Sequence, residues 1–158
     1  MTYKEKLLDP RWQKKRLEVL ERDEWTCQYC HDTEDTLHVH HIYYAASRNP
    51  WDTLESGLVT YCQCCHSFEE YMKKSYPDFN IIEVVKKKED TGTYLICLVG
   101  SGGKSPTIYY MIFKYQSNYV TQEAMFSFGM FQNMCMMYGK WQALINKFEE
   151  PISLTHNG

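Results

Sequence analysis

Cys27-Gln28-Tyr29-Cys30 and Cys62-Gln63-Cys64-Cys65 each carry a pair of cysteines with two residues between them. Each such turn can direct two thiolates at one ion, and two turns together complete a tetrahedral zinc site. The spacing favours Cys62 and Cys65 as ligands over Cys64. Because four thiolates leave no open position for chemistry, the sequence predicts a structural Zn²⁺ held by Cys27, Cys30, Cys62 and Cys65.

Histidines gather between and beside these cysteines. The 31 residues between Cys30 and Cys62 exceed the spacing of a simple zinc ribbon, so we expect secondary structure within them. They include His38-Val39-His40-His41, in an alternating segment that predicts a strand or tight hairpin over residues 36–44. His66 follows the second cysteine pair, at the start of a helix predicted to end by residue 75. Histidine is the usual neutral metal ligand and the usual base near pH 7.

The positions of these histidines suggest a division of roles. His40 and His41 are neighbours on an extended segment, so their side chains point to opposite sides. One of them can therefore bind a metal while the other addresses a different target. His66 follows the second zinc-binding turn, so its side chain could bind the same metal ion.

The remaining pattern predicts an α+β chain of two domains, residues 1–78 and 79–158. Asp9-Pro10 is a favourable helix start, and residues 58–61 form a short apolar stretch ahead of the second cysteine pair.

In the second domain, strand-like segments at residues 81–88, 93–99 and 107–113 predict a small antiparallel sheet. Residues 121–148 have helical periodicity, which predicts a long, strongly apolar C-terminal helix packed against that sheet. Cys97 and Cys135 are expected to be small buried hydrophobes.

Composition limits the class of protein. The chain has 158 residues, of which 44% are hydrophobic, so it can bury a core. No apolar run approaches the roughly 18 residues of a membrane-spanning helix. The charged start, Met1-Thr2-Tyr3-Lys4, is unlike a secretory signal. We therefore expect a cytoplasmic protein with no membrane partner, whose seven cysteines are metal ligands or free thiols.

Charge argues against a protein that binds nucleic acid by electrostatics alone. The formal net charge is −3; residues 1–78 carry 10 Lys+Arg and 14 Asp+Glu, and residues 79–158 carry 7 and 6. Contact with DNA must therefore come from a local cluster or a bound metal. Three basic residues are candidates for such a cluster: Arg11, Lys15 and Arg48.

The stretch Leu37-His38-Val39-His40-His41-Ile42, followed by residues 58–66, resembles the HNH endonuclease family. It is similar to the four-cysteine, zinc-stapled branch that is common in phages and bacteria. Residues 9–18 and 22–27 also resemble the lead-in of such proteins, so the likeness covers roughly residues 9–75. The resemblance implies a ββα-metal (His-Me finger) fold in residues 1–78, with DNA as the substrate. It also implies a location in the bacterial cytoplasm, or in the host cytoplasm if the chain is phage-encoded.

The resemblance assigns roles to the histidines. His40 and His66 match the protein ligands of a catalytic divalent ion, Mg²⁺ or Mn²⁺, and His41 matches the general base that deprotonates the attacking water. This sequence departs from the family motif at one position: where the motif has its middle Asn, this chain has Gly57. In the family that Asn ties down the loop that orients the base, so its absence implies weaker support for His41 rather than loss of a ligand.

Other classes of function remain open. A catalytically weak or inactive binding protein on the same scaffold is the main alternative, such as an inhibitor of a phage or bacterial defence system or a nucleic-acid-binding module. Gly57 and the acidic balance favour it, whereas the set of His40, His41 and His66 favours the enzyme. A purely structural zinc module would leave the histidines unexplained. The apolar helix predicted in the second domain suggests a homodimer contact or a surface for a protein partner.

Overall fold

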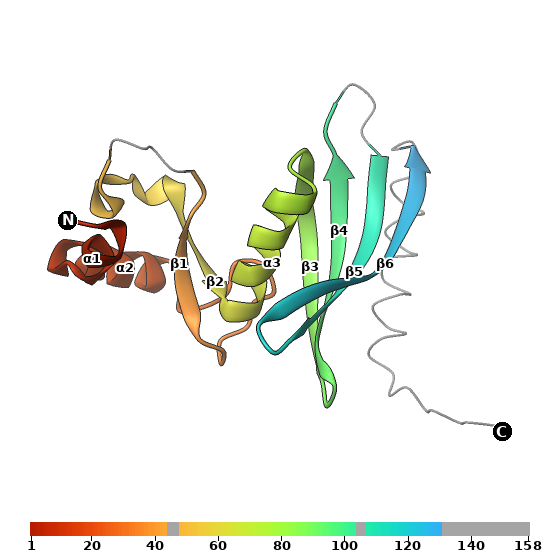
Figure 1. Cartoon of the computed structure of the whole chain (residues 1–158), viewed down its shortest axis with the longest axis horizontal. Helices are drawn as coiled ribbons and strands as arrows, with labels where there is room; N and C mark the ends of the chain where they lie inside the picture. Colours follow the sequence, from red (N-terminus) through yellow and green to blue (C-terminus); the bar gives the residue numbers. More distant parts are fainter. Residues whose placement is uncertain (44–47, 104–106, 131–158) are drawn as a thin grey trace. The chain divides into compact units, whose positions relative to one another are not determined.

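The computed structural model describes residues 1–43, 48–103 and 107–130, which form helices and two antiparallel sheets (Figure 1). The chain divides into two compact units, Met1–Glu69 and Glu70–Gly158. The prediction of a mixed chain with antiparallel sheets is therefore confirmed. In the described part of the chain, no helix has both the length and the apolar character needed to cross a membrane.

Two capped helices open the first unit. In α1 (Tyr3–Leu8), the hydroxyl of Thr2 accepts a hydrogen bond from the backbone N–H of Glu5. In α2 (Pro10–Arg22), the Asp9 carboxylate accepts from the backbone N–H of Arg11 at 2.9 Å. The helix start predicted at Asp9-Pro10 is thus confirmed, because Asp caps the N-terminus and Pro tolerates the first turn.

A two-stranded hairpin and a helix follow. Strand β1 (Leu37–His41) pairs antiparallel with β2 (Leu58–Cys62), and α3 (Gln63–Ser75) begins directly after β2. Two short 3₁₀ turns, η1 (Pro50–Asp52) and η2 (Glu55–Gly57), lie between the strands. These elements confirm the strand and the helix that the sequence predicts here. The core of the unit is a cluster of Trp12, Val19 and Leu58, with Leu7, Val39 and Trp51 packed around it.

An ion pair fastens the end of α2 to β2. The Asp23 carboxylate, with a side chain only 8% exposed, accepts hydrogen bonds from the Arg22 guanidinium at 2.8 and 2.9 Å and from the backbone N–H of Thr60 at 2.9 Å. Arg22 also donates to the backbone carbonyls of Glu55 and Leu58. Burial disfavours the charged carboxylate, but the hydrogen bonds from Arg22 and Thr60 outweigh it and lower the pKa of Asp23.

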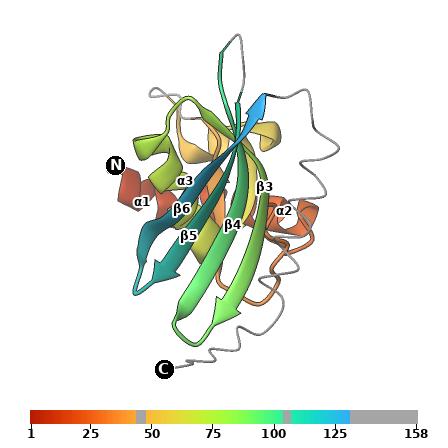
Figure 2. The same cartoon turned by 90° about the vertical axis from the view of Figure 1, so that its right-hand side faces the viewer.

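The second unit contains a four-stranded antiparallel meander, in which the strands lie in the order β3-β4-β5-β6 (Figure 2). Their bounds are Phe79–Glu89 for β3, Gly92–Ser101 for β4, Thr107–Gln116 for β5 and Tyr119–Met130 for β6. The first three confirm the strands that the sequence predicts.

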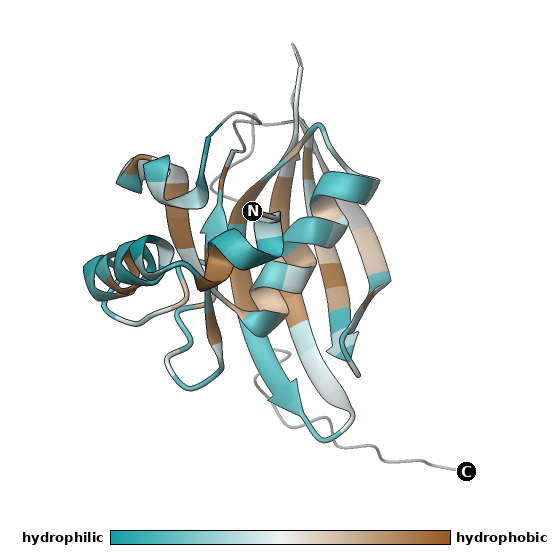
Figure 3. Ribbon diagram, turned by 60° about the vertical axis from the view of Figure 1, so that its left-hand side comes forward, coloured by the Kyte–Doolittle hydropathy of each residue, from teal (hydrophilic) through white to brown (hydrophobic). Residues whose placement is uncertain are grey.

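Apolar residues lie on both faces of this sheet, and hydrophobic stretches run along the strands (Figure 3). Leu95 and Cys97 are buried on one face of β4, while Ile96 joins Tyr110 and Ile112 in a cluster on the other. The burial of Cys97 agrees with its prediction as a small hydrophobe.

The helix predicted from residue 121 is wrong over its first ten residues, which belong to β6. Ser117 and Asn118 both have positive φ, of 52° and 66°, and form a two-residue turn of the type that joins hairpin strands. Beyond the turn β6 pairs with β5, for example Gln122 with Phe113, and exposure alternates from Thr121 to Met125. Pairing with β5 therefore decides the structure of residues 121–130, although their apolar residues recur at helical spacing. Residues 131–148, including Cys135 and the dimer contact expected there, lie outside the described residues.

We expect Asp23→Ala to lower the free energy of unfolding by about 1–3 kcal/mol, because it leaves the Thr60 N–H and the Arg22 guanidinium without their shared acceptor. Urea denaturation of the zinc-loaded protein measures the change. Glu21→Ala, an exposed carboxylate on the same helix turn, is the control and should cost less than about 0.5 kcal/mol. Equal effects of the two substitutions would contradict the role given to Asp23.

Candidate metal centre

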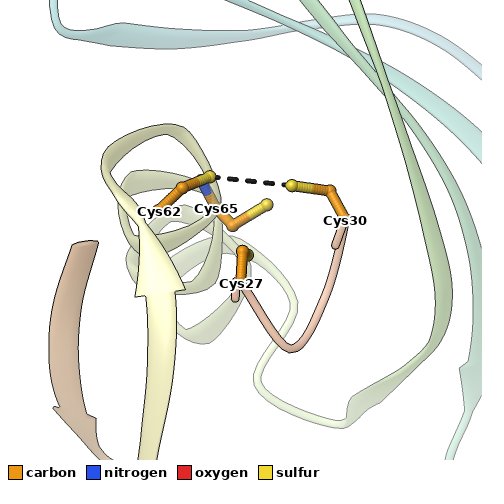
Figure 4. Close-up of side chains that lie close together, drawn as sticks. All are labelled: Cys27, Cys30, Cys62 and Cys65. Atoms are coloured by element: carbon orange, nitrogen blue, oxygen red, sulfur yellow. Dashed lines mark hydrogen bonds between the residues drawn. The ribbon is translucent and has the colours of Figure 1, made fainter. Parts of the chain in front are cut away.

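The four paired cysteines converge on one point (Figure 4). Cys27 and Cys30 lie in the loop between α2 and β1, Cys62 ends β2, and Cys65 lies in the first turn of α3. Their ligand atoms all lie within 4.8 Å of one another, and the Cys30 and Cys62 sulfurs are 3.7 Å apart. Sulfurs at tetrahedral positions on one Zn²⁺ are about 3.8 Å apart, given a Zn–S bond of about 2.3 Å. The four cysteines therefore fit a single zinc ion.

Backbone hydrogen bonds build the two turns that carry these sulfurs. The N–H of His31, a residue with φ of 60°, donates to the Cys27 carbonyl at 2.9 Å and closes the first turn. The N–H of Gln28 donates to the Thr60 carbonyl at 2.9 Å, which ties this turn to β2. In the second turn, the Cys65 N–H points at the Cys62 sulfur at 3.5 Å. Such N–H groups favour a thiolate over a thiol.

The chemistry of the clustered sulfurs also favours a cation. Hydrogen bonding with Cys30 lowers the pKa of Cys27, and hydrogen bonding with Cys27 raises the pKa of Cys65. The two opposite pKa shifts have one cause. Thiolates this close repel one another, so the four thiols cannot all ionise without a compensating positive charge. A bound Zn²⁺ removes that conflict by coordinating all four as thiolates.

Two imidazoles lie together beside the cysteine cluster. His40, 4% exposed, and His66 have ring centroids 5.1 Å apart, with the rings nearly perpendicular. The β1 register places His40 opposite Val59, while His66 lies on α3, one residue after Cys65. The structure thus brings these two predicted metal ligands together.

His38 is a third imidazole in this group, and the sequence motif gives it no role. Its ring centroid is 5.5 Å from that of His66. Burial, followed by the nearby His66, lowers the pKa of His38, so its neutral form is favoured. The signal that could have identified it is the two-residue spacing from His40, since residues i and i+2 share a face of a strand.

His41 lies on the other face of β1, away from His40 and His66. Its ring, 5% exposed, stacks on Trp12 with centroids 5.0 Å apart and planes 19° from parallel. Its Nε2 lies 3.4 Å from the carbonyl oxygen of Pro50. Burial lowers the pKa of His41, although the Pro50 carbonyl partly opposes that effect, so the imidazole is favoured in its neutral form.

Stacked aromatic rings link the cysteine turn to His40. Tyr29, between Cys27 and Cys30, stacks on Tyr61 with centroids 4.3 Å apart, and Tyr61 lies 5.5 Å from His40. The Tyr29 hydroxyl donates to Glu69 on α3 at 2.7 Å. Burial raises the pKa of Tyr61 to about 12, so it acts here as a neutral packing group. The spacing of Tyr29 and Tyr61 in the sequence does not predict this stack.

Gly57 occupies a crowded position. A Cβ at this residue would lie 2.7 Å from the end of the Tyr43 ring and 3.0 Å from a methyl carbon of Thr53. Its carbonyl accepts from the Ile42 N–H at 2.9 Å, which extends the β1–β2 pairing by one step. An asparagine here would have to displace Tyr43, so backbone pairing holds this end of the hairpin instead.

Two of the three basic residues proposed to meet DNA already contact carboxylates. Arg11 pairs with Asp9 at 2.9 Å and lies 4.0 Å above the Trp51 ring. Lys15 lies 3.6 Å from a carboxylate oxygen of Glu55, and Arg48 is exposed. A nucleic acid would have to compete with these acidic side chains for Arg11 and Lys15.

Comparison of the chain with family models, with curated proteins and with solved structures finds no match. Any functional conclusion must therefore rest on the geometry of the cysteines and histidines. The cysteine cluster offers four thiolates and no open position, which suits a structural ion. Beside it, the imidazoles of His40 and His66 lie with ring centroids 5.1 Å apart.

We expect the purified protein to contain about one zinc per chain, which elemental analysis measures. Cys65→Ala should abolish zinc retention and unfold the first unit, because three remaining thiols hold the ion poorly. Cys64→Ala is the matched control: Cys64 is also buried on α3 but is not part of the cluster, so its loss should leave the zinc content unchanged. A zinc-free protein that stays folded in chelator would contradict the structural role.

Proposed function

We propose that this chain is an HNH-type, metal-dependent endonuclease that hydrolyses phosphodiester bonds in DNA. The observation that carries the proposal is the arrangement of β1, β2 and α3. It places His40 and His66 with ring centroids 5.1 Å apart, and it puts His41 next to them in the chain but on the other face of the strand. A structural zinc module has no use for this set of histidines, of which His40 and His41 are buried.

His40 and His66 are the residues that would hold the catalytic cation, such as Mg²⁺ or Mn²⁺. When bound, a divalent ion of this kind neutralises a scissile phosphate and stabilises the oxygen that leaves. Two protein nitrogens leave several coordination positions for water and phosphate. His40 is held by the pairing of β1 with β2, and His66 by its place on α3, so their backbones are fixed before any ion arrives.

His41 has the environment of a general base. The Pro50 carbonyl can only accept a hydrogen bond, so the tautomer with its proton on Nε2 is the one that can donate to this oxygen, 3.4 Å away. In that tautomer Nδ1 is the basic nitrogen of the ring, which is the atom that the proposed role as general base requires. Stacking on Trp12 fixes the plane of the ring, and burial keeps the ring neutral. Pro50 and Trp12 therefore supply the orientation that the absent motif asparagine at position 57 would otherwise support.

A second candidate function is a binding protein that does not cut. The contacts of Arg11 with Asp9 and of Lys15 with Glu55 favour it, because they reduce the positive charge available to the DNA backbone. Under this alternative the cysteine cluster still organises the fold, and the target is a nucleic acid or a protein. The two candidates differ in one measurable property, which is cleavage.

We expect the protein to nick supercoiled plasmid in the presence of a divalent cation. His41→Ala should lower the rate by about 100-fold or more, because a positioned base typically contributes 10²–10⁴-fold. Gel electrophoresis of the plasmid over time measures the rate in Mg²⁺, Mn²⁺ and Ni²⁺. Glu18→Ala, which removes an exposed carboxylate on α2, is the control and should cut as fast as wild type.

Two results would count against the nuclease. If wild type and His41→Ala are equally inert in every cation while retaining zinc, the binding protein becomes the better account. If both nick at the same rate, cleavage comes from a contaminant or from a site that does not use His41.

A further inference from the structure

We propose that Tyr43 is a positioning residue for His41: its ring fills the side-chain space at Gly57 and holds the connection between β1 and β2 beside the imidazole. The inference rests on the proposed function for the purpose of His41. It gives a role to a residue that the motif does not include, and it makes Tyr43 and Gly57 a matched pair. The contact itself can be tested without any cleavage.

The ring of Tyr43 lies against the backbone of Gly57. A Cβ at residue 57 would lie 2.7 Å from both Cζ and Oη of Tyr43, which is closer than packed atoms approach one another. Among the described residues, the glycines with positive φ are Gly92 and Gly103, so the backbone at residue 57 does not itself require glycine. Residue 57 is therefore restricted to glycine by the ring that occupies its side-chain space.

Thr53 borders the same space. Its methyl carbon lies 3.0 Å from the Cβ position at residue 57, so this methyl group and the hydroxyl end of the Tyr43 ring enclose one small volume. Thr53 lies between the turns η1 and η2, which connect β1 with β2. The ring therefore packs the middle of this connection beside the end of β1.

The backbone carbonyl of Pro50 links Thr53 to His41. The Thr53 N–H donates to this oxygen at 3.4 Å, and the Nε2 of His41 lies 3.4 Å from the same oxygen. Both distances are long for hydrogen bonds, so a small displacement is enough to break either contact. A shift of Thr53 therefore moves the acceptor that faces the imidazole.

The other long-range contacts of this connection lie on either side of Thr53. Trp51 of η1 packs on the core cluster, and the Glu55 carbonyl of η2 accepts a hydrogen bond from α2. Thr53 and Leu54 lie between these two anchors, and the side chain of Leu54 is 64% exposed. The space shared with Tyr43 is thus the packing contact that supports the middle of the connection.

Either member of the pair can be changed separately. Tyr43→Ala removes the ring, and Gly57→Ala expels it, because the end of the Tyr43 side chain is what the new Cβ would meet. Both changes act on one contact, so their effects should not add in the double variant. Tyr43→Phe keeps the ring and its Cζ, which makes it the conservative variant.

Exchange of the His41 Nε2 proton with water, followed by ¹⁵N-edited NMR of the zinc-loaded full chain, tests the contact. Wild type should exchange slowly, because the ring is 5% exposed and Nε2 faces the Pro50 oxygen. Tyr43→Ala, Gly57→Ala and the double variant should each exchange faster by about 10-fold or more, and to a similar extent. Tyr43→Phe should restore slow exchange, and Leu54→Ala, an exposed side chain of the same connection, is the control that should match wild type.

Nicking of supercoiled plasmid supplies a second measurement. Tyr43→Ala should lower kcat by about 10-fold or more and leave KM unchanged, because a base displaced by a fraction of an ångström to about 1 Å loses much of its effect. A lower kcat with faster proton exchange is the signature of positioning, whereas a purely structural role would change neither in a folded protein. Zinc content and a thermal melt report whether each variant folds, and Gly57→Ala is the second variant if Tyr43→Ala does not.

The outcomes separate this inference from the nuclease proposal. Unchanged proton exchange in a folded Tyr43→Ala, or single effects that add in the double variant, would overturn the inference and leave the nuclease proposal intact. Faster exchange in Tyr43→Ala, in a protein whose wild type never nicks DNA, would support the contact and defeat the nuclease proposal instead.

Discussion

The first unit of this chain is built around four cysteine side chains whose ligand atoms lie within 4.8 Å of one another. Cys27 and Cys30 come from a loop, whereas Cys62 and Cys65 belong to the junction of β2 and α3. An ion that joins them closes a loop of the chain that contains both strands of the hairpin. Metal binding of this kind is also folding free energy, because the unfolded chain has no such site.

The same junction positions the histidines. His66 follows Cys65 on α3, so a fixed sulfur and a fixed imidazole are adjacent on one helix turn. Tyr29 and Tyr61 extend the contact from the cysteine turn to His40, and Asp23 with Arg22 holds β2 against the end of α2. Packing, ion pairing and metal binding thus act on the same two strands. A change at the cysteines should therefore alter the separation of His40 and His66 without touching either ring.

Much of the first unit could be predicted because its signals are local. Paired cysteines, a capped helix start at Asp9-Pro10 and a short apolar strand before Cys62 each specify structure within a few residues. Other features depend on contacts between distant residues, which spacing alone does not show. Examples are the contact of Trp12 with His41 and that of Tyr29 with Tyr61. Another is the position of the Tyr43 ring, which leaves no room for a side chain at residue 57.

The failure at residues 121–130 has a physical cause as well. Their apolar positions fit a helical period when they are considered together with residues 131–148, but the turn at Ser117 and Asn118 returns the chain along β5. Ladder hydrogen bonds to a neighbouring strand then outweigh a weak local preference. A polar two-residue turn between apolar runs was the signal that pointed to a hairpin.

X-ray absorption at the zinc edge of the purified protein reports which atoms surround the ion. We expect four sulfurs bound to the zinc, each at about 2.3 Å. A shell that contains nitrogen or oxygen ligands, with fewer than four sulfurs, would contradict the assignment of Cys27, Cys30, Cys62 and Cys65 as the clamp that orders this unit.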